Sequence, residues 1–206
     1  MLVVHHLNNS RSQRILWLLE ELGAPYQIKA YQRDLTTNLA PPELEAVHPL
    51  GKSPVIEDDG HVIAESGAIV DYIVRKHGGG RLAPKPGTWD HEAYLEWLHY
   101  AEGSAMLPLM INLYIMRLGD AAAPLKPRVD SEIDRHLGYV DKALAGKDYI
   151  LGDFTAADVQ LSFAGEVGRA FGRLEAMPNV KAWVERLHDR PAFKASLEKG
   201  GAYNLA

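Results

Sequence analysis

A cluster of helix- and strand-breaking residues divides this chain into two parts of different character. It consists of three consecutive glycines at 78–80, followed by Pro84, Pro86 and Gly87. Neither a helix nor a strand tolerates such a density of glycine and proline. We therefore expect a linker at residues 79–88 that joins a first domain at 1–78 to a second domain at 89–206.

The part before the linker alternates between strand and helix patterns. Short apolar or alternating runs predict strands, and apolar residues at helical spacing predict helices. The predicted order is a strand at 2–6, a helix at 10–22, a strand at 26–31, an irregular connector at 34–48, two strands at 54–56 and 61–63, and a helix that buries Ile69, Val70, Ile73 and Val74. This order describes an α/β domain of the form βαβ, connector, ββα.

The part after the linker has a helical pattern throughout. Two stripes of apolar residues recur at helical spacing. They are Val129, Ile133, Leu137, Val140 and Leu144 in the first stripe, and Val180, Trp183, Val184 and Leu187 in the second. We expect the second domain to be an all-α helical bundle.

The composition narrows the chemistry that the chain can perform. Its net charge is −5 and its Lys and Arg residues are not clustered, so we expect no nucleic acid partner. Cysteine is absent, so any sulfur chemistry must use a bound thiol. The chain opens without a basic leader or a long apolar stretch, which predicts a cytoplasmic protein that does not bind membranes.

Five motifs in order resemble those of the cytosolic glutathione transferase family over nearly the whole chain. They are HHLNNSRSQRILWLLEELG at 5–23, HPLGKSPVI at 48–56, AESGAIVDYI at 64–73, YILGDFTAADV at 149–159 and MPNVKAWVERLHDRPAF at 177–193. Within the family, the chain is most similar to the serine-type bacterial and fungal enzymes. The resemblance implies a thioredoxin-like N-terminal domain that binds glutathione, and a helical domain that carries the pocket for an electrophile.

Ser10 matches the catalytic serine of these enzymes. Local pattern alone favours another role, because Ser10-x-x-Gln13 is a capping box at the start of a helix. The two roles are compatible, since a hydroxyl can accept one hydrogen bond while it donates another. A free thiol has a pKa of ~8.5 and only the thiolate attacks well, so a hydroxyl donor here would activate glutathione. Ser12 and Asn8 on the same loop are the alternatives.

The resemblance also implies where the rest of glutathione binds. It places a cis proline at Ser53–Pro54, with the Ser53 backbone turned toward the cysteinyl part. Glu65–Ser66 opens a helix whose free amides suit the γ-glutamyl carboxylate. His48 and Lys52 are the expected contacts of the glycyl carboxylate, although a solvated surface role fits either residue equally well.

The helical domain carries the remaining residues that the resemblance assigns. In the family, the position of Glu102 approaches the glutathione amine of the neighbouring subunit, so we expect a homodimer. The alternative for Glu102 is a solvated helix residue. Met106, Met110 and Tyr114 follow on the same predicted helix and are candidates for the electrophile pocket, because methionine adapts to irregular apolar shapes. An ordinary core stripe is the alternative for these three.

Two histidine-containing patterns could be mistaken for metal sites. Glu96-x-x-His99 with Glu102 places three potential metal ligands on one helical face, but a carboxylate-bridged site needs a second copy and the chain has none. His5–His6 at the end of a strand is more typical of a surface pair. We therefore expect no metal.

Thr155-x-x-Asp158 has the pattern of a capping box variant. The cap explains both residues, so we expect Asp158 to stabilise the start of a helix and to take no part in catalysis.

The function that these features favour is a glutathione transferase that adds the glutathione thiolate to a hydrophobic electrophile, with glutathione-dependent peroxide reduction as a side activity. The main alternative is a non-catalytic transferase-like module that binds a ligand or another protein. A glutathione-dependent isomerase is less favoured, because residues 9–13 lack the SSCxW-like signature of that relative.

Overall fold

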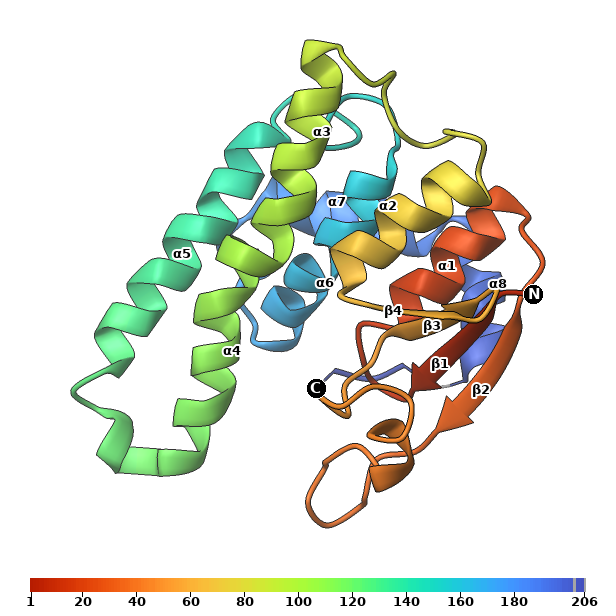
Figure 1. Cartoon of the computed structure of the whole chain (residues 1–206). Coiled ribbons are helices and arrows are strands. Elements are labelled where there is room, and N and C mark those ends of the chain that lie inside the picture. The colour runs from red at the N-terminus through yellow and green to blue at the C-terminus, as the bar shows by residue number, and fades with distance from the viewer. Residues whose placement is uncertain (202, 206) are drawn as a thin grey trace. The chain divides into compact units, whose positions relative to one another are not determined.

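The computed structural model describes residues 1–201 and 203–205, which group into two compact units (Figure 1). The first unit combines residues 1–83 with residues 188–205, and the second contains residues 84–187. The sequence instead predicts that every residue after the linker belongs to the helical domain. The exact bounds of the linker stay a prediction.

The first unit is built on a four-stranded mixed sheet. Its strands are β1 (Val3–Leu7), β2 (Gln27–Tyr31), β3 (Val55–Asp58) and β4 (His61–Ala64). They lie in the order β2-β1-β3-β4, with β1 parallel to β2 and antiparallel to β3, and with β3 and β4 forming a hairpin. β1 therefore has a strand neighbour on each edge, and its residues 4–7 are buried.

Three helices and a short 3-10 turn complete the first unit. They are α1 (Gln13–Leu22), the turn η1 (Pro42–Leu44), α2 (Ser66–Lys76) and α8 (Pro191–Gly200). The apolar residues predicted for the inward face of α2 are all buried. The βαβ, connector, ββα order predicted from the sequence is confirmed.

The helix α8 belongs with the first unit because it packs against α1. The ring of Phe193 meets Trp17 edge-on, with 5.3 Å between the centroids. The Arg190 side chain forms two hydrogen bonds with the carboxylate of Glu21. These apolar and polar contacts explain why α8 groups with the first unit, although the sequence predicts that it belongs to the helical domain.

The second unit is helical. Its elements are α3 (Trp89–Tyr100), the π-helical segment η2 (Ala101–Ala105), α4 (Met106–Ile115), the 3-10 segment η3 (Met116–Ala122), α5 (Lys126–Ala143), α6 (Ala156–Ala170), the 3-10 turn η4 (Leu174–Ala176) and α7 (Pro178–His188). Both predicted apolar stripes are buried, one on α5 and one on α7. None of the helices in the described part of the chain has the length and apolar character needed to cross a bilayer.

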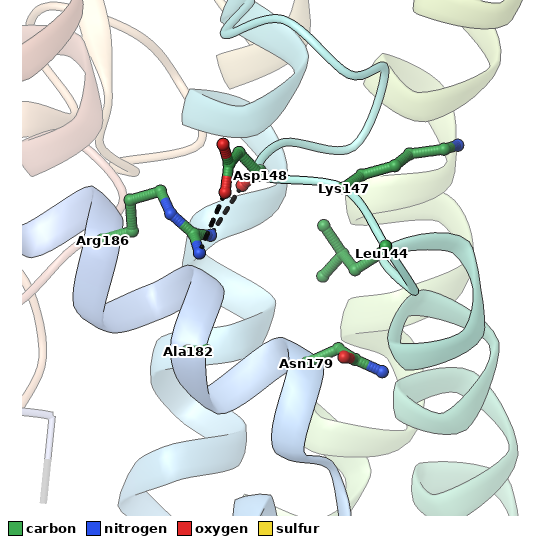
Figure 2. A pocket seen from close by; sticks show the side chains of 7 residues that line it. Leu144, Lys147, Asp148, Asn179, Ala182 and Arg186 are labelled. Carbon is green, nitrogen blue, oxygen red and sulfur yellow. Dashed lines mark hydrogen bonds and ion pairs between the residues drawn. The ribbon is translucent and has the colours of Figure 1, made fainter.

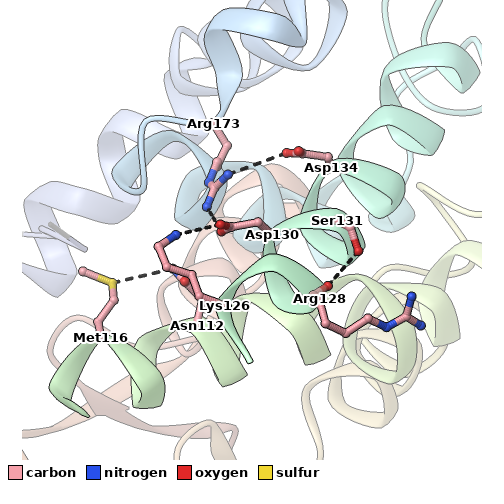
Figure 3. Close-up of polar contacts among 8 residues, drawn as sticks. All are labelled: Asn112, Met116, Lys126, Arg128, Asp130, Ser131, Asp134 and Arg173. Carbon is pink, nitrogen blue, oxygen red and sulfur yellow. Dashed lines mark hydrogen bonds and ion pairs between the residues drawn. The ribbon is translucent and has the colours of Figure 1, made fainter. Parts of the chain in front are cut away.

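Asp130 on α5 links that helix to the chain that follows α6 (Figure 3). Lys126 donates to its carboxylate at 2.7 Å, and Arg173 also bonds to it while lying 3.8 Å from Asp134. The Lys126 bond is the main cause that lowers the pKa of Asp130, and burial opposes it. Asp130 therefore contributes more to stability when it is ionised than when it is protonated.

Candidate functional site

Ser10 lies in the turn that joins β1 to α1, and its side chain is buried. Its hydroxyl oxygen is 2.8 Å from the carbonyl oxygen of Leu7 and 2.8 Å from the hydroxyl oxygen of Ser12. The backbone N–H of Ser12 donates to it at 3.2 Å. A donated N–H polarises a hydroxyl and strengthens it as a donor toward a further partner.

The capping box predicted for Ser10 and Gln13 is wrong. The helix α1 begins at Gln13 with Ser12 in the N-cap position, and no described side chain caps it. Gln13 instead donates its side-chain amide to Ser196 on α8. Ser10 lies two residues before the N-cap, and the preceding residue, Asn9, has a left-handed backbone conformation with φ of 49°.

The two alternatives to Ser10 are held by other contacts. Ser12 is fully buried, and its hydroxyl is 2.8 Å from Nδ1 of His6 and 3.2 Å from the backbone N of Leu7. Asn8 accepts the backbone N–H of Arg33 on its side-chain oxygen at 2.8 Å. Of the two serines, Ser10 keeps the greater exposure, 5% against none.

The prediction of a surface pair at His5–His6 is also wrong, because both imidazoles are buried. His5 lies 2.8 Å from the Tyr31 hydroxyl and 2.8 Å from the Glu57 carboxylate. His6 faces the other way, toward Ser12 and the carbonyl of Gly200. Burial is the main cause that lowers the pKa of both histidines.

The Ser53–Pro54 peptide bond is cis, as expected. It directly precedes β3, and the Ser53 hydroxyl donates to the backbone carbonyl of His5 at 2.9 Å. Since Ser10 and Ser12 are bonded to Leu7 and Ser53 to His5, the end of β1 holds the Ser10 turn and the cis bond in the same region.

The helix α2 begins at Ser66, as predicted, and Glu65 occupies its N-cap position. Glu65 has φ of 68° and ψ of 116°, a conformation that costs a non-glycine residue free energy and is concentrated at functional sites. The Glu65 side chain makes no capping bond to the helix, whose first amides favour an anion.

Arg14 is a functional candidate that the sequence interpretation missed. It lies on α1 with its side chain buried, and its guanidinium donates to the Ser66 hydroxyl at 3.2 Å. A buried cation beside the start of α2 strengthens the attraction for a carboxylate. The sequence does contain a signal for this role: Arg14 is a charged residue next to Ile15, near the N-terminus of a predicted helix whose inner face is otherwise apolar.

His48 and Lys52 lie in the loop that precedes the cis bond. His48 is half-buried and its Nδ1 is 3.4 Å from the backbone N of Leu50, whereas Lys52 is exposed. Both residues are therefore on the same loop as Ser53. Their contacts do not indicate which group of a ligand either side chain would bind.

The four residues singled out in the helical unit differ in exposure. Glu102 lies in the π-helical segment η2, a type of segment found frequently at functional sites. Met106, Met110 and Tyr114 follow at intervals of four residues and so share one face of α4, but Met106 is buried, Met110 is half-buried and Tyr114 is 59% exposed. Only the last two residues present surface to a ligand.

The helical unit also contains a pocket of about 290 Å³, shown in Figure 2. Two of its lining residues interact: Arg186 donates to the backbone carbonyl of Asp148 at 2.8 Å and lies 3.2 Å from its carboxylate. The lining residues are Leu144, Gly146, Lys147, Asp148, Asn179, Ala182 and Arg186. None of the residues predicted for the site lines this pocket, and its size is at the lower limit for small-molecule sites.

Asp158 has the structural role predicted for it. Thr155 and Asp158 form the capping box at the start of α6, and Asp158 also accepts from Trp183 at 3.0 Å and from the backbone N–H of Ile150 at 2.9 Å. Burial is the main cause that raises the pKa of Asp158. Within residues 1–201 and 203–205, no group of three acidic or histidine side chains has the arrangement of a metal site.

Comparison with known proteins finds the same family in both halves of the chain. Residues 1–75 match the family "Glutathione S-transferase, N-terminal domain", and residues 100–191 match "Glutathione S-transferase, C-terminal domain". Glutathione S-transferase 3 of Schizosaccharomyces pombe is 38% identical over 97% of this chain and 88% of its own length.

Solved structures agree with this result. A glutathione S-transferase from Actinobacillus pleuropneumoniae superposes with a TM-score of 0.89 at 32% identity, over 100% of this chain and 95% of its own. A sphingomonad glutathione S-transferase complexed with glutathione superposes with a TM-score of 0.79 at 26% identity, over 97% of this chain and 98% of its own. The predicted combination of a thioredoxin-like domain and a helical domain is confirmed.

Proposed function

The chain belongs to the glutathione S-transferase family, and on that premise we propose that it is a serine-type enzyme in which the Ser10 hydroxyl ionises bound glutathione. The thiolate then attacks the electrophilic carbon of a hydrophobic substrate. Peroxide reduction by the same thiolate is a side activity of this site.

The surroundings of the Ser10 hydroxyl carry the proposal. It bonds to the last residue of β1, the strand to which Ser53 of the cis bond also bonds, and it accepts the backbone N–H of Ser12. A hydroxyl that is polarised in this way donates a strong, charge-assisted hydrogen bond to a thiolate. Lowering the thiol pKa by about two units requires only ~2.7 kcal/mol of preferential stabilisation of the thiolate.

The other contacts hold glutathione along its length. The γ-glutamyl carboxylate binds at the start of α2, where Glu65 and Ser66 present the helix amides and Arg14 adds a buried positive charge. The Ser53 backbone binds the cysteinyl part beside Pro54. His48 and Lys52 bind the glycyl carboxylate, for which a cationic or hydrogen-bonding side chain is suited.

The helical unit supplies the electrophile site and the dimer contact. Met110 and Tyr114 present apolar surface on α4, whereas Met106 is buried on the same face of the helix. In a two-fold homodimer, Glu102 reaches the glutathione amine of the other subunit, where opposite charges attract. The enzyme acts in the cytoplasm and uses no metal.

Turnover of a generic aryl halide in the presence of glutathione tests this function. The proposal predicts formation of the thioether with release of halide, and a dependence on glutathione concentration that saturates. Binding of glutathione without turnover of any electrophile or peroxide in a broad screen would instead identify a non-catalytic binding module.

A further inference from the structure

The side chains of Ser10, Ser12 and His6 form a continuous chain of hydrogen bonds. The hydroxyl oxygens of Ser10 and Ser12 are 2.8 Å apart, and the Ser12 hydroxyl is 2.8 Å from Nδ1 of His6. On its other side, Nε2 of His6 is 3.0 Å from the backbone carbonyl oxygen of Gly200. All three side chains are buried.

The partners determine the direction of the hydrogen bonds. A carbonyl oxygen can only accept, so Nε2 of His6 carries a proton and donates to Gly200. Burial lowers the pKa of His6, which keeps the imidazole neutral and makes Nδ1 an acceptor. Ser12 then donates to His6, since this contact is shorter than its 3.2 Å approach to the Leu7 carbonyl.

The orientation of the Ser12 hydroxyl determines which acceptors are available to the Ser10 hydroxyl. With its proton on the His6 side, the Ser12 oxygen is an acceptor, and Ser10 donates either to it or to the Leu7 carbonyl, each at 2.8 Å. When Ser10 donates to Ser12, every hydroxyl proton in the chain points toward His6. A proton that reaches the Ser10 oxygen can therefore be passed on to Nδ1.

Gly200 packs closely against the side chains around His6, so that a side chain at this position would force its neighbours to shift. A Cβ atom at this position would lie 2.7 Å from Leu16, 2.8 Å from the side-chain oxygen of Gln13 and 3.2 Å from Nε2 of His6. The C-terminal end of α8 thus places the backbone carbonyl of Gly200 against the His6 imidazole. The ammonium group of the neighbouring Lys199 forms an ion pair with Glu20 at 2.6 Å.

We propose that His6 accepts the thiol proton of bound glutathione through Ser10 and Ser12. This inference rests on the proposed role of Ser10. The S–H bond breaks and its proton passes to the Ser10 oxygen, the Ser10 proton passes to Ser12, and the Ser12 proton passes to Nδ1 of His6. The electron pair of the S–H bond stays on sulfur, which becomes the thiolate.

The transfer leaves every hydrogen bond of the chain reversed. The imidazolium of His6 donates to Ser12, Ser12 donates to Ser10, and Ser10 donates to the thiolate. The Gly200 carbonyl still accepts from Nε2 and stabilises the imidazolium. A lone imidazolium in this buried position is unfavourable, so His6 gains its proton only when the thiolate forms, and it loses the proton once the thiolate has been consumed.

Nitrogen NMR of the histidine rings in the unsubstituted enzyme tests the transfer directly. Saturation with glutathione should protonate Nδ1 of His6, whereas saturation with S-methylglutathione, which has no thiol proton, should leave it neutral. His5 lies beside His6 on β1 and is equally buried, so its signals serve as the internal control. A His6 ring that stays neutral with glutathione bound, while the ultraviolet thiolate band is present, overturns the proposal.

Calorimetry in buffers of different ionisation enthalpy provides a second measurement. The unsubstituted enzyme should form the thiolate with almost no proton release to solvent. In His6→Asn, an oxygen can still accept from Ser12 but cannot take the proton, so either the release rises toward about one proton per site or the thiolate band is lost. The control variant His5→Asn should behave like the unsubstituted enzyme. Equal proton release and an equal thiolate band in His6→Asn and the unsubstituted enzyme would overturn the proposal.

The Ser10→Ala variant separates this inference from the proposed function. If Ser10→Ala keeps the thiolate band, the proposed role of Ser10 fails, and the transfer through it fails as well. If Ser10→Ala loses the band but His6 stays neutral in the unsubstituted enzyme, only the transfer to His6 fails.

Discussion

The side-chain amide of Gln13 donates to the hydroxyl of Ser196 at 2.9 Å, across 183 positions of the sequence. Both side chains are buried, so this bond joins the first turn of α1 to α8 in the interior of the first unit. The same first turn follows the Ser10 loop. The C-terminal helix therefore supports the segment that we propose to activate glutathione.

Replacing Gln13 with Ala should destabilise the protein, because the bond is lost and a cavity is left. The expected loss is about 1–3 kcal/mol in the free energy of unfolding. Denaturant unfolding of Gln13→Ala measures it, and Gln27→Ala, at an exposed position on β2, is the matched control. Equal midpoints for Gln13→Ala and the control would contradict a stabilising role for the bond.

Replacing Thr155 with Ala should remove the cap of α6 without affecting glutathione. The Thr155 hydroxyl accepts the backbone N–H of Ala157 at 3.3 Å, and loss of such a cap typically costs ~1 kcal/mol. Thermal unfolding and a glutathione titration should show a lower melting temperature and an unchanged affinity. Thr36→Ala, at an exposed position, is the control, and an unaltered melting temperature in Thr155→Ala would disprove the capping role.

The contribution of Asp58 to stability should depend on pH. Burial raises its pKa, but the hydrogen bonds from His77 at 2.6 Å and from Tyr72 at 2.9 Å outweigh burial, so the pKa is lowered. An acid with a lowered folded pKa stabilises the protein fully above its unfolded pKa of ~3.9, and it loses this contribution as the pH falls through the folded pKa.

The free energies of unfolding of Asp58→Asn and the parent should therefore differ most at neutral pH and converge in acid. Asp59→Asn is the control, because Asp59 is adjacent but 64% exposed on its side chain. A difference between Asp58→Asn and the parent that stays constant from neutral pH to pH ~3 would show that ionisation of Asp58 does not stabilise the fold.

Glu102→Ala should weaken glutathione binding without unfolding the chain, if Glu102 reaches the ligand amine of a second subunit. Loss of one charged contact predicts an increase of about 10-fold in the dissociation constant, with an unchanged melting temperature. Sedimentation of the parent should show a dimer. A parent that is fully active as a monomer would contradict this assignment.

Local patterns in the sequence predicted the parts of the fold that depend on local geometry. Asp59 and Gly60 both have positive φ, at 49° and 79°, and form the tight turn between β3 and β4 that the sequence predicts. The helical stripes on α2, α5 and α7 are buried because the spacing of apolar residues alone decides which face turns inward.

The parts that the sequence could not predict depend on partners that are distant in the chain. The buried His6 side chain bonds to the carbonyl of Gly200, 194 positions later, and nothing near His6 in the sequence encodes that contact. The pairing of Arg14 with Ser66 has the same character. Ser10 has the pattern of a helix cap, but the N-cap of α1 lies two residues further on, and the Gln13 side chain of the expected capping box bonds to Ser196, 183 positions away.

The ultraviolet titration of the thiol of bound glutathione in Ser10→Ala, compared with the parent enzyme, tests the central claim most directly. The account predicts that Ser10→Ala still binds glutathione, that the thiol pKa rises toward the free value of ~8.5, and that turnover falls about 10–100-fold as ~1.4–2.8 kcal/mol of stabilisation is lost. A thiol pKa that is the same in Ser10→Ala and in the parent, with near-normal turnover, would contradict it and would leave Ser12 or Asn8 as the residue that activates the thiol.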